Sequence, residues 1–126
     1  MNVNTIQSER PELSRVFEHI DANRDQFVNR LLDYLRHPSI SAQKIGMGEV
    51  AELLVSMLNR LGLQSQMILT SGYPVVMGRW ERAPGAPTIL LYGHYDVQPP
   101  DPLDAWISPP FEPTVRDGRV YARARR

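Results

Sequence analysis

The spacing of apolar residues changes along the chain at Gly62, and this change limits the folds that the sequence can adopt. Before Gly62, apolar residues recur three and four positions apart, which is the period of one face of an α-helix. After it, they alternate or run together in short blocks bounded by glycine and proline, as in β-strands. Two or three helices followed by strands predict an α/β fold in which helices and a sheet form layers.

Two stretches of the first half have the helical pattern. The first starts near Ser8 and ends before Pro38, and the polar residues 21–24 leave open one long helix or two helices joined by a kink. The second covers about residues 48–61, and Gly62 is suited to the residue just after its end. Its apolar stripe is expected to be buried core: Val50, Leu53, Leu54, Met57, Leu58 and Leu61.

Three segments after Gly62 read as strands: residues 64–70, 75–80 and 88–92. The last is a continuous apolar run, which predicts a strand buried on both faces. Asp117-Gly118 predicts a hairpin turn between short strands at residues 114–115 and 119–121. The proline-rich residues 99–113 are expected to form an ordered loop that is pinned by apolar anchors, namely Leu103, Trp106, Ile107 and Phe111.

Composition excludes several kinds of protein. Lysine plus arginine and aspartate plus glutamate number 14 each, so net charge favours neither a nucleic-acid partner nor a membrane surface. Cysteine is absent, which excludes disulfides, thiol nucleophiles and thiolate metal sites. The first residues, MNVNTIQSERPEL, lack the basic and apolar regions of a secretory signal, so we expect a cytoplasmic protein.

His94 and Asp96 follow the apolar run directly, after a glycine at which the backbone can turn. Ligands of open α/β sheets gather at the carboxyl ends of strands. Residues two apart on an extended chain point the same way, and a metal-bound histidine usually donates its second ring N–H to a carboxylate. The pair therefore has the chemistry of a metal ligand with its orienting partner, although the same spacing also occurs in ordinary loops.

Residues 89–123 closely resemble the metal-binding segment of the zinc-dependent dipeptidase, aminoacylase and carboxypeptidase family of metallopeptidases. Their sequence is ILLYGHYDVQPPDPLDAWISPPFEPTVRDGRVYAR. It is most similar to the carnosine-dipeptidase-like branch. The G-H-x-D-V-Q-P core, the W-x-S-x-P-F segment and the D-G-R-x-Y-A-R tail occur in order. The earlier LLDYLRHPSIS and VAELLVSMLNRLGL are similar to helices at the start of that family, so the resemblance covers nearly the whole chain.

This resemblance implies that residues 1–126 are the N-terminal portion of a hydrolase catalytic domain whose complete active site holds two zinc ions. It makes His94 a metal ligand and Asp96 the catalytic carboxylate that orients its imidazole. The implied substrate is a small peptide, as for a dipeptidase. Alternatives are deacylation of N-acyl amino acids and a non-catalytic α/β module that binds a partner.

The chain departs from the family pattern after Arg123. A glycine, two small residues and a bridging aspartate are expected there, whereas the sequence has Ala124, Arg125 and Arg126. The general-base glutamate, the remaining ligands and the lid domain are not in this sequence either. We therefore expect a truncated and inactive fragment with weak or no zinc binding, which self-associates through exposed strand edges.

Other polar and aromatic residues are expected to have surface or structural roles rather than catalytic ones. Surface positions are expected for four acidic residues, and neither His19 nor His37 is expected to bind metal. Trp106 and Phe111 are expected to pin their loop rather than to stack on a substrate. The four acidic residues are Asp101, Asp104, Glu112 and Asp117.

Overall fold

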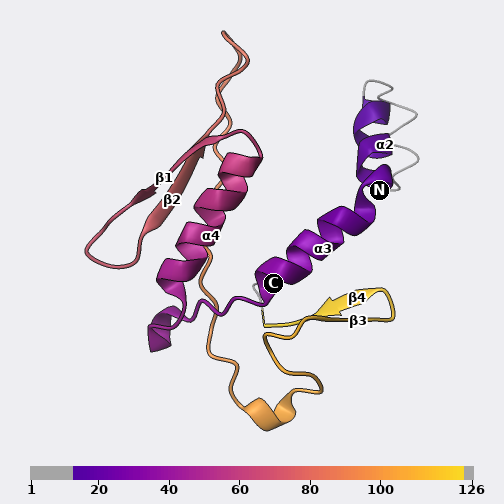
Figure 1. Ribbon diagram of the computed structural model, residues 1–126, viewed down its shortest axis with the longest axis vertical. Coiled ribbons are helices and arrows are strands. Elements are labelled where there is room, and N and C mark those ends of the chain that lie inside the picture. Colours follow the sequence, from indigo (N-terminus) through magenta and orange to yellow (C-terminus); the bar gives the residue numbers. More distant parts are fainter. Residues whose placement is uncertain (1–12, 124–126) are drawn as a thin grey trace. The chain divides into compact units, whose positions relative to one another are not determined.

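The computed structural model describes residues 13–123, so the expected start near Ser8 and the residues 124–126 lie outside the described residues. The chain divides into two compact units, Met1–Tyr34 and Leu35–Arg126, which are treated separately. Helices come first and short strands follow, as Figure 1 shows, so the predicted α/β class is confirmed. Within residues 13–123, no helix combines the length and the apolar character that a membrane crossing requires.

The first helical stretch consists of two helices, α2 (Ser14–Ala22) and α3 (Arg24–Leu35). The break falls at Asn23, whose backbone N–H and side-chain amide both donate to the His19 carbonyl oxygen, at 3.1 and 2.8 Å. A side chain that bonds to the backbone in this way competes with the helical pattern. Of the two possibilities that the sequence left open, the structure has two helices. Much of the apolar face remains exposed, including Val16, Ile20 and Leu31.

Helix α4 (Met47–Arg60) confirms the second predicted helix to within one residue at each end. Gly62 has φ +81° and its N–H donates to the Asn59 carbonyl oxygen, while the Leu63 N–H donates to Leu58. These two bonds define a Schellman motif, which satisfies carbonyls at the helix end. The expectation that Leu61 is buried was wrong: it caps the helix and is 62% exposed.

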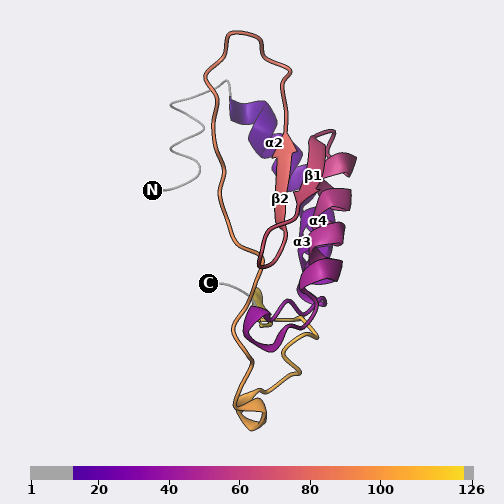
Figure 2. The same ribbon diagram turned by 90° about the vertical axis from the view of Figure 1, so that its left-hand side faces the viewer.

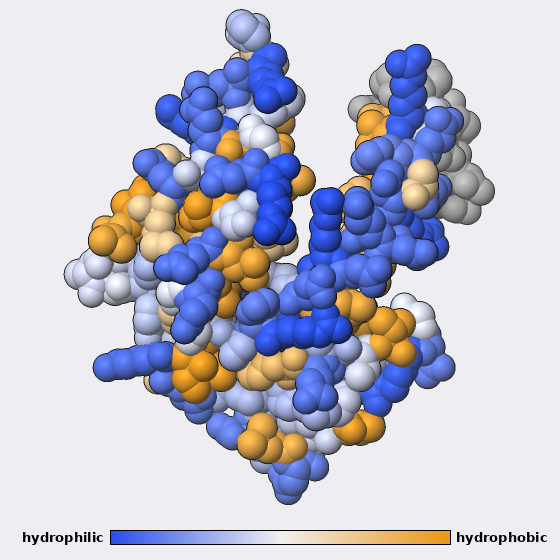
Figure 3. All heavy atoms as spheres, viewed as in Figure 1, coloured by the Kyte–Doolittle hydropathy of each residue, from blue (hydrophilic) through white to orange (hydrophobic). Residues whose placement is uncertain are grey.

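Strands β1 (Gln64–Ile68) and β2 (Val75–Arg79) pair antiparallel, and α4 packs on one face of this hairpin, as Figures 1 and 2 show. Gly78 makes this close contact possible, because a Cβ there would lie 3.0 Å from Leu63 and 3.2 Å from Leu58. Hydrophobic side chains nevertheless reach the surface over this layer, as the space-filling view in Figure 3 shows. The layer is therefore only partly closed.

The predicted third strand does not form. Residues 88–92 have no strand assignment, and the side chains of residues 89–92 are 81–90% exposed. A strand that is buried on both faces needs hydrogen-bonded neighbours and a covering layer on each side. Residues 13–123 pair no strand with this run, so it remains extended and exposed.

The last part of the described chain is a loop followed by the predicted hairpin. A short 3-10 helix, η3 (Leu103–Ala105), precedes β3 (Thr114–Arg116) and β4 (Arg119–Tyr121). Asp117 and Gly118 connect the strands, and both have positive φ, as a tight hairpin turn of the primed type requires. Trp106 Nε1 donates to the Pro100 carbonyl oxygen at 2.7 Å, so this anchor is confirmed. Leu103 and Ile107 are exposed and anchor nothing.

The buried residues gather at the end of α3, in the connector between α3 and α4 (residues 36–46), and in the first half of α4. They are Leu35, Ser39, Ile40, Met47, Val50 and Ala51. A bridge between Ile40 and Ile45 folds the connector back on itself, around the 3-10 turn η2 (Ser41–Gln43). Gly46 follows with φ +67°, and a Cβ built on it would lie 1.8 Å from the Pro38 carbonyl oxygen. The connector therefore depends on a glycine at this position.

Gly46→Ala should destabilise the chain by about 2–5 kcal/mol. This is the sum of about 1–2 kcal/mol for a left-handed backbone conformation and about 1–3 kcal/mol for overpacking. Gly48→Ala is the matched control, because a Cβ on this helical glycine meets nothing within 4 Å. That control should stabilise the chain by about 0.5–1 kcal/mol. Urea unfolding of the three proteins measures both changes, and equal effects of the two substitutions would contradict the role of Gly46.

We propose that the run at residues 88–92 pairs with the same run of a second copy. Residues 83–93 carry no charged side chain, so two copies meet without like-charge repulsion. Antiparallel pairing about Leu90 sets Ile89 opposite Leu91. Sedimentation equilibrium should show concentration-dependent dimers, which Leu90→Lys abolishes. Leu69→Lys, at another exposed leucine, should leave them unchanged. A monomer at high concentration would overturn the proposal.

Candidate functional site

The structure brings together the side chains of His94 and Asp96. The imidazole Nδ1 of His94 lies 2.8 Å from Asp96 Oδ1 and 3.0 Å from the Asp96 carbonyl oxygen. Their side chains are 42% and 33% exposed, so the pair lies at the surface of its unit without being fully solvated. The pairing that their spacing suggested is thus present in the structure.

The position of Asp96 selects one tautomer of the neutral His94 imidazole. Because Nδ1 faces oxygen acceptors, the ring proton resides on Nδ1 and donates to them. Nε2 then carries a lone pair, and no hydrogen bond within the described residues engages it. This is the form in which a histidine binds a metal ion.

The second oxygen of the Asp96 carboxylate is also bonded. Ser41 Oγ donates to Asp96 Oδ2 at 2.7 Å. This hydrogen bond is the main cause that lowers the pKa of Asp96; partial burial opposes it, and the nearby His94 lowers the pKa further. Asp96 is therefore a carboxylate at neutral pH, with one oxygen bonded to His94 and the other to Ser41.

Two serines of the connector bind the segment that carries the site. Ser39 Oγ donates to the Tyr95 carbonyl oxygen, and the Val97 N–H donates to the Ser39 carbonyl oxygen at 2.8 Å. The sequence analysis assigned no role to Ser39 or Ser41. The available signal was the Ser-x-Ser spacing around Ile40, since residues two apart on extended backbone share a side.

Two tyrosine hydroxyls complete the network. Tyr73 donates to the Ser41 carbonyl oxygen and Tyr95 donates to the Pro74 carbonyl oxygen, both at 2.7 Å. Burial, followed by the charge of Asp96, raises the pKa of Tyr95, so its hydroxyl keeps the proton that it donates. The turn before β2 is thereby tied both to the connector and to the site segment.

The described residues do not hold a metal ion by themselves. Within residues 13–123, no three side chains of histidine, cysteine, aspartate or glutamate gather closely enough to share an ion. Zinc sites need three or four protein ligands, and His94 fits as one of them. The side chains of the other candidates are exposed and lie outside the network, as expected for the four acidic residues: His19, His37, Asp101, Asp104, Glu112 and Asp117.

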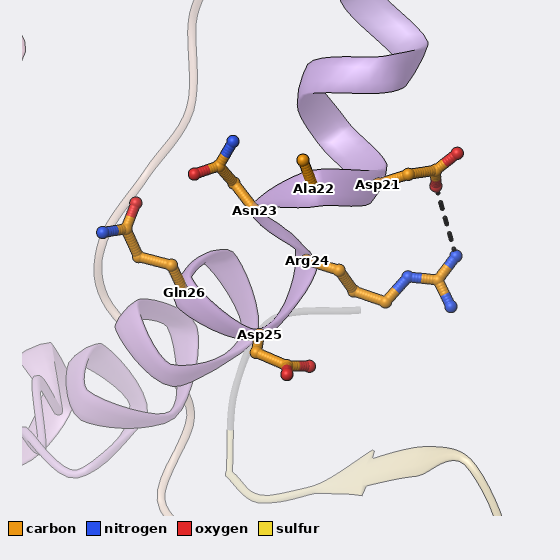
Figure 4. A pocket seen from close by; sticks show the side chains of 6 residues that line it. All are labelled: Asp21, Ala22, Asn23, Arg24, Asp25 and Gln26. Carbon is orange, nitrogen blue, oxygen red and sulfur yellow. Dashed lines mark hydrogen bonds and ion pairs between the residues drawn. The ribbon is translucent and has the colours of Figure 1, made fainter.

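Surface hollows also occur elsewhere within residues 13–123. Figure 4 shows one at the junction of α2 and α3, where Arg24 reaches the Asp21 carboxylate at 3.5 Å among other exposed polar side chains. Another lies at the terminal hairpin, where the Arg116 guanidinium sits 4.3 Å above the ring of Tyr121. Neither is lined by His94 or Asp96, so neither belongs to the candidate site.

Known proteins share this segment. The sequence pattern of Peptidase family M20/M25/M40 matches residues 90–125, which include His94 and Asp96. Cys-Gly metallodipeptidase dug1 of Schizosaccharomyces pombe is 33% identical over 88% of this chain and 26% of its own length. Succinyl-diaminopimelate desuccinylase of Bordetella pertussis is 38% identical over 72% of this chain and 23% of its own length.

A solved structure agrees with these similarities. An M20 family metallo-carboxypeptidase, Sso-CP2 of Sulfolobus solfataricus, matches with a TM-score of 0.70 and 39% identity, over 76% of this chain and 22% of that one. The chain is related to the M20 peptidases. The resemblance seen in the sequence, including its dipeptidase-like branch, is confirmed. The chain spans about a quarter of the length of the two curated relatives named above, 26% and 23%.

The lowered pKa of Asp96 predicts a pH dependence of stability. The folded chain holds this proton less tightly than the unfolded chain, so the contribution of Asp96 is fully present above about pH 4 and is lost as the pH falls through the lowered pKa. Asp96→Asn should cost about 1 kcal/mol at pH 7, after allowance for solvent screening, and less at pH 3.

Urea unfolding of both proteins at the two pH values measures this difference. Asp104→Asn, at an exposed aspartate, is the matched control and should cost little at either pH. A cost of Asp96→Asn that stays constant or grows on acidification would contradict the assignment of the carboxylate.

Proposed function

We propose that this chain carries part of the active site of a metal-dependent hydrolase, in which His94 is a metal ligand and Asp96 orients it. The observation that carries the proposal is the 2.8 Å contact between His94 Nδ1 and Asp96 Oδ1, which leaves Nε2 as the open coordinating atom. The match of residues 90–125 to the M20 peptidases supports the same roles.

The proposed reaction is hydrolysis of a dipeptide at a site with two zinc ions. Zinc held by His94 and further ligands would supply an activated water and polarise the amide carbonyl. Asp96 keeps the proton of His94 on Nδ1 and thereby keeps the Nε2 lone pair available. The negative charge of Asp96 also favours a cation bound at Nε2.

A second candidate is deacylation of N-acyl amino acids, which the similarity to the Bordetella pertussis desuccinylase favours. A peptide bond and an N-acyl bond are both amides, so His94 and Asp96 would act in the same way in either reaction. Substrate choice depends on groups around the scissile amide, and assays of an intact relative on both substrate classes separate the two candidates.

A third candidate is a binding module without catalysis. It is favoured by the lack of a three-residue metal cluster within residues 13–123. This module would bind no zinc at His94, whereas the hydrolase proposal requires His94 to be the preferred zinc-binding histidine of the chain. Zinc titration therefore distinguishes the two.

Titration with Zn²⁺, followed by NMR of the histidine rings, tests the proposal. The chain has three histidines, so His19 and His37 serve as internal controls. Signals of His94 should respond at the lowest zinc concentration and through Nε2, and His94→Ala should remove this response. With one ligand the affinity is weak, so we also expect no turnover of a dipeptide panel with added zinc. Equal responses of the three histidines would overturn the role of His94, and turnover abolished by a chelator and by His94→Ala would overturn the expected inactivity.

A further inference from the structure

We infer that Ser41 is a positioning residue for His94 and acts on it through Asp96. This inference rests on the proposed function, because it concerns the orientation of the proposed metal ligand. Ser41 is 53 positions before His94 in the sequence, and the contact between their segments arises only through folding. The role assigned to Ser41 is to hold the carboxylate that in turn holds the imidazole.

The carboxylate of Asp96 is held at both oxygens. Oδ1 accepts the proton of His94 Nδ1 at 2.8 Å, and Oδ2 accepts the hydroxyl proton of Ser41 at 2.7 Å. Rotation of the carboxylate about its last torsion would break one of these bonds. This torsion is otherwise broad and weakly restricted in aspartate. The Ser41 hydroxyl therefore restricts the rotation of the Asp96 carboxylate, and through it the orientation of the His94 imidazole.

Ser41 is itself held by its main chain. Tyr73 donates its hydroxyl proton to the Ser41 carbonyl oxygen at 2.7 Å. The residue before it, Ile40, is buried and bridged to Ile45, while Ser39 is 3% exposed and bonded to Tyr95 and Val97. The hydroxyl of Ser41 is thus presented from an anchored backbone, in contrast to a serine on a free surface loop.

The physical consequence is a preference for one tautomer of the metal-free imidazole. With Asp96 held, Nδ1 keeps the proton and Nε2 keeps the lone pair. Without the Ser41 hydroxyl, Oδ2 turns toward water and the carboxylate loses its fixed direction. Nδ1 then keeps only the Asp96 carbonyl oxygen, at 3.0 Å, as a fixed acceptor, so the preference for the Nδ1–H tautomer weakens and the ring samples more than one orientation.

NMR of the ¹⁵N-labelled, metal-free chain at pH 8 measures this preference directly. The wild-type His94 ring should show the Nδ1–H tautomer, Ser41→Ala should show a larger share of the Nε2–H tautomer, and Ser41→Thr should restore the wild-type signals because it keeps the hydroxyl. Ser65→Ala is the matched control: Ser65 bonds to Val55 and Asn59, away from the site, and its removal should leave His94 unchanged. An unchanged His94 tautomer in Ser41→Ala would overturn the inference.

A second variant covers the case in which Ser41→Ala does not fold. Tyr73→Phe keeps the Ser41 hydroxyl and releases only its main-chain anchor, so the tautomer preference of His94 should weaken partly. A wild-type His94 spectrum in Tyr73→Phe would then overturn the inference. Both readouts use metal-free protein, so they are independent of zinc binding at His94.

Zinc titration of the wild-type chain and of Ser41→Ala tests the proposed function separately from the positioning role. If wild-type His94 binds Zn²⁺ in the titration, Ser41→Ala should weaken that binding by up to about tenfold, the lower end of the effects seen for groups behind metal ligands. If His94 does not bind zinc while Ser41→Ala still shifts the tautomer, the proposed function fails and the positioning role stands. Undiminished zinc binding in Ser41→Ala would count against the positioning role.

Discussion

The docking of the connector onto the segment that follows the apolar run organises the second unit of this chain. Ser39 binds the backbone on both sides of Asp96, through Tyr95 and Val97, and Ser41 binds the Asp96 side chain itself. The two side-chain bonds join residues that are 56 and 55 positions apart in the sequence. Closing a loop of this length costs conformational entropy that several bonds together must offset.

The buried core supports that junction. Ile40 and Ser39 are among the few buried residues, and the others lie at Leu35 and at the start of α4. Gly46 allows the chain to pass the Pro38 carbonyl oxygen and enter the helix. The residues that exclude water are therefore concentrated beside the polar network that holds His94 and Asp96. This arrangement strengthens the hydrogen bonds of the network, because a partly dehydrated environment screens them less.

The rest of the described chain shows how much a strand depends on its neighbours. The run at residues 88–92 has the composition of a buried strand and yet remains exposed, while β1 and β2 pair because they are adjacent in sequence. Local pairing needs only a short loop, whereas a central strand needs partners that come from elsewhere in a fold. The matched regions make up only 26% and 23% of two relatives.

The sequence by itself determined the elements whose signals are local. The period of apolar residues located α4, Gly62 marked its end, and Asp117-Gly118 located the terminal hairpin turn. The spacing of His94 and Asp96 was also sufficient to predict their contact, because two positions of extended chain place both side chains on one side. In each of these cases the interacting groups lie within a few residues of one another.

Only the tertiary structure decided the features that join distant residues. It placed Ser41 against Asp96 and set Tyr73 on the Ser41 carbonyl, and within residues 13–123 it left residues 88–92 without strand partners. A serine hydroxyl has many possible partners, and an apolar run has the same composition whether it is buried or exposed. Periodicity reports which face of an element is apolar, but what covers that face depends on the path of the whole chain.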